Sequence, residues 1–314
     1  MRILVAGALG HIGSHLIRSL PKALPGAEIL MLDSMMTQRY PSLFALPPEG
    51  RYRFIECDVA RADLRRFVEG CDVVICLAAI TDAASSFDHA DRVEENNFTA
   101  TRLLAEACVA TGAGLIFPSS TSVYGTQSGV IDEDCPEAEL KPQSPYAATK
   151  LREERLIAGL CAEKGLRAVI CRLGTIYGVS PGMRFHTAVN KFCWQAVLGQ
   201  PVTVWSSAYD QKRPYLDLTD CGRAMEFIIA RDLFDGRIYN VITANHTVRD
   251  VVDTIRRSVP DLQVKFVDSP IMNQLSYEVL PTRMRAKGFM PEGSLGRGIG
   301  DTVALLRAAN GSPA

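Results

Sequence analysis

The chain has 314 residues, which could form two or three domains or one large α/β unit with an appended lobe. Hydrophobic residues make up 47% and charged residues 22%, as is typical of a globular protein with a large core. The formal net charge of −1 argues against electrostatic capture of nucleic acid or of an anionic membrane surface.

In the first half of the chain, short apolar runs alternate with helical patterns. The predicted strands are Ile3–Ala6, Ile29–Leu32, Tyr52–Cys57, Val73–Leu77, Gly114–Pro118 and Ala168–Leu173. A first helix is predicted from the spacing of Ile12, Leu16, Ile17 and Leu20, and two more over Asn97–Val109 and Ala147–Ala162. Near-continuous apolar strands between helices predict an α/β fold with a doubly wound parallel sheet.

The regular alternation weakens after about Gly178, where the pieces become shorter and proline and glycine interrupt them. We therefore expect a first domain over residues 1–178, to which residues 211–245 partly return. Residues 179–314 would form mainly a smaller, interleaved lobe, with a disordered tail over residues 310–314.

A glycine-rich segment follows the first strand. Gly7, Gly10 and Gly13 have GxxGxxG spacing between a strand and a helix, at the start of a β-α-β unit. Gly7 would allow a tight turn, Gly10 would let the backbone approach a pyrophosphate, and Gly13 would let the helix pack closely on the strand. The helix N-terminus would offer N–H groups to the phosphates, so the segment predicts a dinucleotide site. A glycine turn without a ligand is the alternative.

Two acidic residues follow the next strands. Asp33 lies twenty residues after Gly13, where a carboxylate accepts hydrogen bonds from the adenosine ribose. It would repel a 2′-phosphate, which favours NAD over NADP, although Arg39 nearby could soften this preference. Asp58 would lie near the adenine, or it could cap a helix. For Asp33, an ordinary turn carboxylate is the alternative.

Tyr146 and Lys150 form a Y-x-x-x-K pattern on a predicted helix, where positions i and i+4 share one face. An ammonium beside a phenol favours the phenolate, and the positive nicotinamide of NAD⁺ would add to this effect. The tyrosine could then act as a base near neutral pH. Ser120, in PSSTSVYG at the end of a strand, could hydrogen-bond both a substrate hydroxyl and the tyrosine. A solvated helix face and a turn serine are the structural alternatives.

Together these segments resemble the extended short-chain dehydrogenase/reductase superfamily, in its NAD-dependent epimerase/dehydratase branch. The resemblance runs from Met1 to about Leu306. Further matching pieces are CDV at Cys57, CLAA at Cys76, NFTATRLL at Asn97, RLGTIYG at Arg172, QKRPYLDLTD at Gln211 and GRIYNV at Gly236.

The resemblance implies a Rossmann-fold enzyme that oxidises a hydroxyl of a nucleotide-linked sugar, usually at C4, with tightly held NAD⁺. Tyr146 would take the hydroxyl proton, Lys150 would hold the nicotinamide ribose, and Ser120 would polarise the oxygen. In an epimerase the keto sugar then rotates and the hydride returns to its other face. Asn96 would lie beside the nicotinamide, and Arg213 would bind the substrate diphosphate through its guanidinium fork.

The expected cofactor-binding residues are Gly7, Gly10, His11, Ile12, Gly13, Asp33, Asp58, Val59, Leu77, Ala78, Ala79, Asn96, Tyr146 and Lys150. The expected substrate-binding residues are Ser120, Ser122, Thr175 and Arg213. The resemblance also implies a homodimer, formed through the helices over Asn97–Val109 and Ala147–Ala162. The apolar faces of these helices are equally compatible with packing inside one monomer.

The sequence departs from several subtype patterns of the family at Thr121 and Ser122. The 4,6-dehydratases carry an acid pair there, the sugar-acid decarboxylases carry a glutamate at the position of Ser122, and the 3,5-epimerases carry a cysteine at that position. Elimination, decarboxylation and 3,5-epimerisation therefore lose support. A 4-epimerase remains, with a sugar-nucleotide reductase or dehydrogenase as the alternative and a catalytically silent NAD-binding protein as the third hypothesis.

Other departures leave the sugar open. Thr175 replaces a usual asparagine, Cys76 a common histidine, Val179 a frequent proline and Pro214 a frequent acid. His186 and Asn190 fall in the substrate-facing stretch, with surface positions as the alternative.

One motif indicates another enzyme class. Gly178-Val179-Ser180-Pro181-Gly182 matches the G-x-S-x-G elbow of serine hydrolases. That elbow uses the N–H of the residue after the serine, and Pro181 has none, so we do not expect a hydrolase.

The remaining signals concern location and metal binding. The first apolar run is too short for a signal peptide, no stretch is long enough to span a membrane, and we expect a cytoplasmic protein. Nine cysteines without a CxxC pair indicate reduced thiols and no metal site, since Cys71 and Cys76 would point to opposite faces of a strand. The sequons at Asn97, Asn245 and Asn310 are expected to be chance matches.

Overall fold

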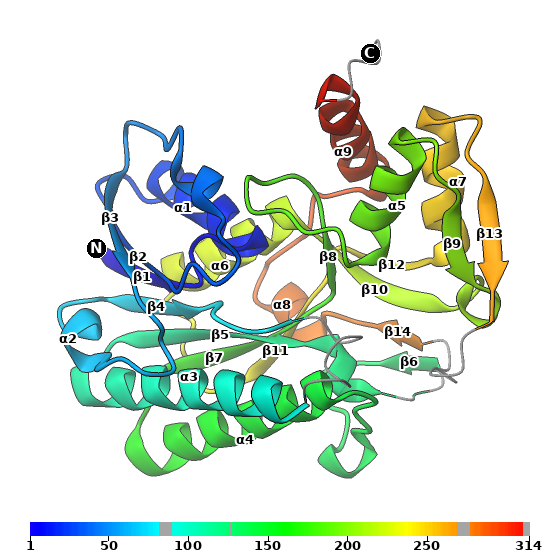
Figure 1. The fold of residues 1–314 in the computed structure, drawn as a ribbon. Coiled ribbons are helices and arrows are strands. Elements are labelled where there is room, and N and C mark those ends of the chain that lie inside the picture. Colours follow the sequence, from blue (N-terminus) through cyan, green and yellow to red (C-terminus); the bar gives the residue numbers. More distant parts are fainter. Residues whose placement is uncertain (82–89, 126, 128, 269–276, 310–314) are drawn as a thin grey trace.

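A parallel sheet of seven strands forms the centre of the protein (Figure 1). Its order is β3-β2-β1-β4-β5-β7-β11, and every neighbouring pair is parallel. The strands are β1 (Arg2–Ala6), β2 (Glu28–Asp33), β3 (Arg51–Glu56), β4 (Val73–Cys76), β5 (Gly114–Ser120), β7 (Ala168–Leu173) and β11 (Ile238–Val241). The predicted doubly wound α/β fold is confirmed.

The computed structural model describes residues 1–81, 90–125, 127, 129–268 and 277–309. The predicted disordered tail and the sequon at Asn310 lie outside the described residues.

Helices cover both faces of the sheet (Figure 1). On one face α1 (His11–Ala23) and α6 (Leu218–Ala230) pack on Ile3 and Val5 of β1. On the other face α3 (Ala90–Thr111) and α4 (Pro145–Lys164) pack in a core that contains Leu4 and Ala6. Successive β1 residues thus alternate between two cores, which is why this strand is apolar throughout. The short α2 (Arg65–Val68) contacts α3.

Two helix boundaries differ from the prediction. Helix α3 begins at Ala90 rather than Asn97. Among the described side chains of the extra turns, Asp91, Glu94 and Glu95 are exposed and Val93 is buried, so these turns show little apolar periodicity. Helix α4 begins earlier than predicted, because Ser144 caps its N-terminus and Pro145 occupies the first helical position.

A second group of helices forms a lobe beside the sheet (Figure 1). Helices α5 (Ala188–Val197), α7 (Val248–Ser258) and α9 (Leu295–Ala309) share a core with strands β9 (Val202–Trp205) and β13 (Val264–Val267). Strands β8 (Thr175–Tyr177), β10 (Lys212–Asp217) and β12 (Ala244–Thr247) form a three-stranded sheet. The chain enters this lobe after β7 and returns to the main sheet at β11, so the two parts are interleaved.

The remaining elements are short. Strands β6 (Gly129–Ile131) and β14 (Tyr277–Val279) pair, and α8 (Thr282–Ala286) contacts β11. The 3-10 helices among the described residues are η1 (Tyr40–Leu43), η3 (Thr121–Tyr124), η4 (Glu137–Glu139) and η5 (Ser206–Ala208). Across the described part of the chain, no helix is long and apolar enough to cross a membrane, and no group of three potential metal ligands occurs. All nine cysteines are free.

Candidate functional site

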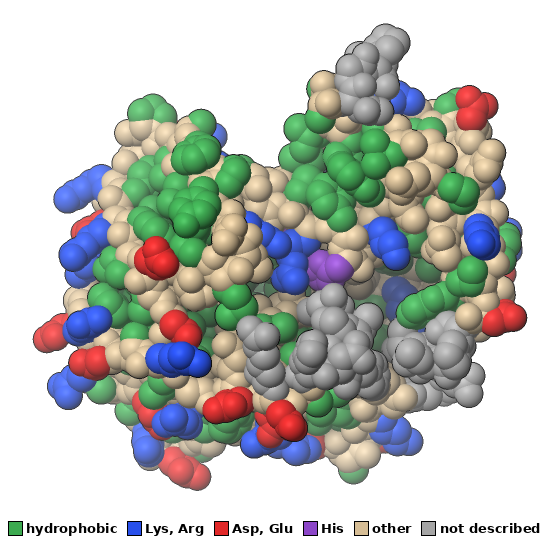
Figure 2. Space-filling view, viewed as in Figure 1, with side chains coloured by type: hydrophobic (Ala, Val, Ile, Leu, Met, Phe, Trp, Pro, Cys, Tyr) green, Lys and Arg blue, Asp and Glu red, His purple; other side chains and the backbone are tan. Residues whose placement is uncertain are grey.

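A cavity of about 580 Å³ lies where the carboxyl ends of the central strands meet the second lobe. Figure 2 shows the molecule hollowed between the two parts, with basic and histidine side chains gathered in the hollow. Every predicted cofactor-binding residue lines this cavity, as do Ser120, Ser122 and Thr175. Arg213 does not line it.

The glycine segment has the geometry that a pyrophosphate requires. Gly7 has φ = 80°, and a Cβ there would lie 2.7 Å from the backbone of Leu77. A Cβ on Gly13 would lie 2.3 Å from the carbonyl oxygen of Gly7. Gly10 precedes α1, and no described side chain caps this helix N-terminus. The first N–H groups of α1 can therefore bind an anion in the cavity.

The carboxylate of Asp33 is fixed by backbone hydrogen bonds. Its Oδ2 accepts from the N–H of Leu9 and its Oδ1 from the N–H of Met35, each at 3.0 Å. Arg39 also lines the cavity and donates to the carbonyl oxygen of Gly182 at 2.8 Å. Asp58 accepts from the N–H of Ala60 in a turn. These positions fit an adenosine at the ends of β2 and β3.

Tyr146 lies in the first turn of α4 and lines the cavity. Burial raises the pKa of Tyr146, the Lys150 ammonium lowers it, Glu153 raises it, and Arg184 lowers it. Burial prevails, so the pKa of the phenol in the protein alone is above its ordinary value. A further positive charge in the cavity would lower this pKa.

Lys150 is 3% exposed and forms an ion pair with Glu153 at 3.0 Å. Burial alone would lower the pKa of Lys150, but the charges of Glu153, Tyr146 and Cys76 raise it. Glu153 was not identified from the sequence, because the Y-x-x-x-K pattern ends at Lys150. The polar residues that follow in the next helical turn give no sign that one of them is buried.

Ser120 ends β5 and caps the 3-10 helix η3. Its Oγ accepts hydrogen bonds from the N–H of Ser122 at 3.2 Å and from the Ser122 hydroxyl at 2.8 Å. Thr121 is turned away and donates to the carbonyl oxygen of Leu173 at 3.2 Å. The Ser120 hydroxyl thus keeps its own proton for a ligand oxygen in the cavity.

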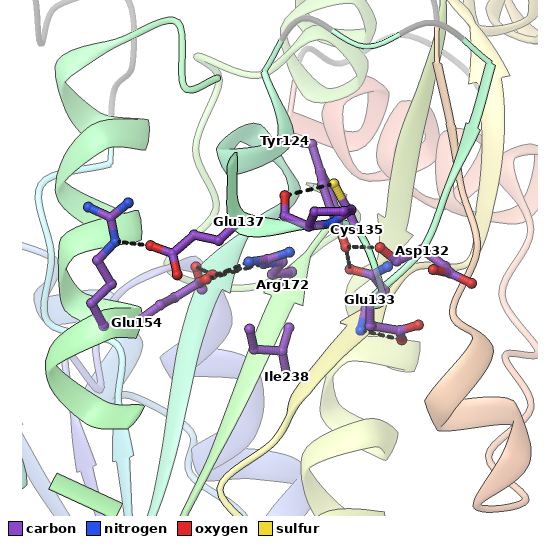
Figure 3. A network of polar contacts seen from close by, with 12 residues as sticks. Tyr124, Asp132, Glu133, Cys135, Glu137, Glu154, Arg172 and Ile238 are labelled. Carbon is purple, nitrogen blue, oxygen red and sulfur yellow. Dashed lines mark hydrogen bonds and ion pairs between the residues drawn. The ribbon is translucent and has the colours of Figure 1, made fainter. Parts of the chain in front are cut away.

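A buried polar network supports this turn from behind (Figure 3). Arg172 of β7 donates three hydrogen bonds to Glu154 of α4, at 2.7, 3.0 and 3.3 Å, and its guanidinium lies 4.7 Å from the Tyr124 ring centre. The Tyr124 hydroxyl donates to Asn240 of β11 at 2.9 Å. The network joins β7, β11 and η3 to the helix that carries Tyr146, so these elements keep a fixed relative position.

The loop after β8 closes on the glycine segment. The Nε2 of His11 lies 2.9 Å from the carbonyl oxygen of Gly178, and the Ser14 hydroxyl donates to Ser180 Oγ at 3.0 Å. Burial lowers the pKa of His11 to about 4, so its ring is neutral at neutral pH. Ser180 is buried and donates to the carbonyl oxygen of His11, which gives it a structural role rather than that of a nucleophile.

The substrate-facing stretch divides into two kinds of residue. Arg184 and His186 line the cavity, and Arg184 donates to the hydroxyl of Thr81. Asn190 is fully buried; its side chain accepts a hydrogen bond from the N–H of Gly178 and donates one to the carbonyl oxygen of Arg184. Arg213 instead lies 5.3 Å from the Tyr277 ring centre and donates to Gln211.

Asn96 and Asn97 shape the cavity after β4. Asn96 lines the cavity and donates to Asn97 Oδ1 at 3.1 Å. Asn97 is fully buried, accepts from the N–H of Ile80 at 2.8 Å and donates to its carbonyl oxygen at 2.9 Å. The sequon at Asn97 is therefore inaccessible, and its side chain instead fixes the cavity wall.

Comparison with known proteins agrees with this geometry. The model of the NAD dependent epimerase/dehydratase family matches residues 3–241. The uncharacterized UDP-glucose epimerase YtcB of Bacillus subtilis (strain 168) is 32% identical over 249 residues, which cover 77% of this chain and 76% of that protein.

The trifunctional UDP-glucose 4,6-dehydratase/UDP-4-keto-6-deoxy-D-glucose 3,5-epimerase/UDP-4-keto-L-rhamnose-reductase RHM1 of Arabidopsis thaliana is 27% identical over 96% of this chain, which spans 46% of that enzyme. Among solved structures, UDP-glucuronic acid 4-epimerase from Bacillus cereus in complex with UDP-glucuronic acid and NAD has 26% identity and a TM-score of 0.87, covering 98% of this chain and 100% of that chain. The chain belongs to the NAD-dependent epimerase/dehydratase family.

Proposed function

We propose that the protein is an NAD-dependent 4-epimerase of a nucleotide-linked sugar. The observation that carries the proposal is that Tyr146, Lys150 and Ser120 line the same cavity as the glycine segment and Asp33. This cavity supports the binding of a dinucleotide beside a general base, a cation and a hydrogen-bond donor.

The side chains divide the chemistry among them. Bound NAD⁺ would supply the hydride acceptor. The Tyr146 phenolate would accept the proton of the sugar hydroxyl and later return it to the ketone oxygen. Ser120 would donate a hydrogen bond to that oxygen, and the Lys150 ammonium would stabilise the phenolate. Because both proton and hydride return to the sugar, there is no net oxidation, as isomerisation requires.

The distribution of acidic groups favours epimerisation over elimination of water. The acidic residues of the described cavity lining are Asp33 and Asp58, which follow β2 and β3. Strands β2 and β5 are three strand spacings apart, about 14 Å, so these carboxylates lie far from Ser120. Thr121 and Ser122 beside Ser120 offer only hydroxyls. Elimination needs a nearby acid to protonate the leaving hydroxyl.

We further propose a UDP-linked sugar. The solved UDP-glucuronic acid 4-epimerase from Bacillus cereus holds UDP-glucuronic acid, and a second solved structure, MoeE5, which is 27% identical to this chain, holds UDP-glucose. A homodimer and a cytoplasmic location stay predictions, and light scattering of the purified protein tests the former.

The test is incubation of the protein and NAD⁺ with a panel of UDP-, GDP-, CDP- and dTDP-sugars, followed by NMR. We expect one pair of C4 diastereomers to interconvert without net change in nicotinamide absorbance. Stoichiometric consumption of NAD⁺ or NADH would instead identify a dehydrogenase or reductase. Binding of NAD⁺ with no change in any sugar would favour the silent binding protein.

A further inference from the structure

A carboxylate that the proposed chemistry does not use lies next to Lys150. Glu153 follows Lys150 by three residues on α4, and its side chain is fully buried. Its Oε2 is 3.0 Å from Lys150 Nζ, and its Oε1 accepts a hydrogen bond from the Thr101 hydroxyl of α3. Lys150 Nζ also lies 4.5 Å from the ring centre of Phe117 on β5. Three elements therefore enclose a buried ion pair that includes a proposed catalytic residue.

Stability alone does not account for this pair. Removing two charges from water costs several kcal/mol, and well-packed apolar side chains often stabilise a protein equally well. The neighbouring acid has a different function: Glu154 binds Arg172 and Ser119 in the network of Figure 3 and so joins α4 to β5 and β7. Glu153 contacts the lysine of the site instead.

We propose that Glu153 is a positioning residue that anchors the Lys150 ammonium and, through its negative charge, sets the pH range in which Tyr146 can act as a base. The inference rests on the proposed function for the role of Tyr146. It implies that Tyr146 remains a protonated phenol near neutral pH until a cation enters the cavity.

The groups around the pair determine the direction of the effect. Tyr146 and Lys150 face Glu153 from α4, Cys76 from β4 and Thr101 from α3, and Arg184 acts on Tyr146 from the loop after β8. Burial raises the pKa of Cys76 to about 11, so this thiol is neutral near pH 7. The Glu153 charge raises the pKa of Tyr146, whereas Lys150 and Arg184 lower it. As long as Lys150 keeps its charge, the phenol should therefore ionise at lower pH without the Glu153 charge.

The test is Glu153→Gln, which keeps the shape of the side chain and removes its charge. Tyrosinate absorbance is titrated with pH, and the difference from the same protein with Tyr146→Phe isolates this phenol. We expect its midpoint to fall by about one pH unit in E153Q, since a nearby unit charge shifts a buried group by this much or more. The low-pH limb of turnover, which reports ionisation of the base, should shift in the same direction.

Glu154→Gln is the matched control, because it changes the next residue of the same helix in a second buried ion pair. It should lower stability and leave the Tyr146 midpoint in place. An unchanged midpoint in E153Q, or an equal shift in E154Q, would overturn the inference.

A measurement on the unaltered protein covers the case in which E153Q does not fold. NMR of ¹³C-labelled lysines, with Lys150 assigned by Lys150→Arg, should show Lys150 titrating above its ordinary value, and titration below it would contradict the inference. Neither titration needs turnover. An active enzyme without the E153Q shift would therefore refute only this inference, and absence of epimerisation would refute only the proposed function.

Discussion

Gly13→Ala should destabilise the protein and weaken NAD binding. The added Cβ would lie 2.3 Å from the carbonyl oxygen of Gly7 and 2.7 Å from the backbone of Ala8. Backbone atoms cannot rotate away, so the start of α1 must move by about 1 Å to reach ordinary contact. A displacement of this size can lower the reaction rate of a preorganised site about a hundredfold. Overpacking costs about 1–3 kcal/mol, against a gain of about 1 kcal/mol from replacing glycine in a helix.

Gly300→Ala in α9 is the matched control, because no atom lies within 4 Å of the Cβ it would add. This variant should gain stability by about 1 kcal/mol. Urea denaturation measures both changes, and quenching of protein fluorescence by NAD⁺ measures affinity. If Gly13→Ala bound NAD⁺ as tightly as the unaltered protein and unfolded at the same urea concentration, then neither stability nor NAD binding would depend on the close packing at Gly13.

Three further predictions concern single side chains. Tyr146→Phe should lower turnover by about 10²–10⁴-fold while NAD⁺ affinity stays nearly constant, and turnover within a few-fold of the unaltered enzyme would exclude Tyr146 as the base. Asp33→Ser should raise the NADPH-to-NADH affinity ratio by about tenfold or more in fluorescence titrations, because the carboxylate that repels a 2′-phosphate is gone; an unchanged ratio would argue against an adenosine ribose at Asp33. His11 has a pKa of about 4 in the folded protein against 6.5 as its ordinary value, so its contribution to stability is complete above pH 6.5 and is lost as the pH falls towards 4. The melting temperature should therefore fall less between pH 7 and pH 4.5 in His11→Gln than in the unaltered protein, and parallel pH curves would show that burial does not hold the ring neutral.

The fold could be predicted largely from local patterns. Apolar β-branched runs bounded by glycine or aspartate identify the strands, and their alternation with helices predicts a doubly wound parallel sheet. The order of the strands was not predicted. The boundary of α3 at Ala90 could not be predicted, since Asp91, Glu94 and Glu95 of its first two turns are exposed and the apolar spacing of a helix is missing there.

The candidate site shows where local patterns stop being informative. Motifs identify Tyr146 and the glycines because each requirement lies within a few residues of sequence. The partners Thr101 and Glu153 are 52 residues apart, and no local pattern indicates that they meet. The resemblance assigns Arg213 to the substrate diphosphate, which stays a prediction. Its guanidinium lies 5.3 Å from the ring centre of Tyr277, 64 residues later in the chain, and no local pattern indicates that contact. Burial also raises the pKa of Tyr146 against the effect of Lys150, and burial is a property of the whole fold.

Transfer of a label at C4 tests the central chemistry most directly. A nucleotide sugar deuterated at C4 is incubated with the protein and NAD⁺ in ordinary water, and the product is analysed by NMR. We predict that the C4 epimer keeps its deuterium at C4 and that the Tyr146→Phe protein forms almost none of it. An epimer that carries a C4 hydrogen from water would contradict reversible hydride transfer within one closed site.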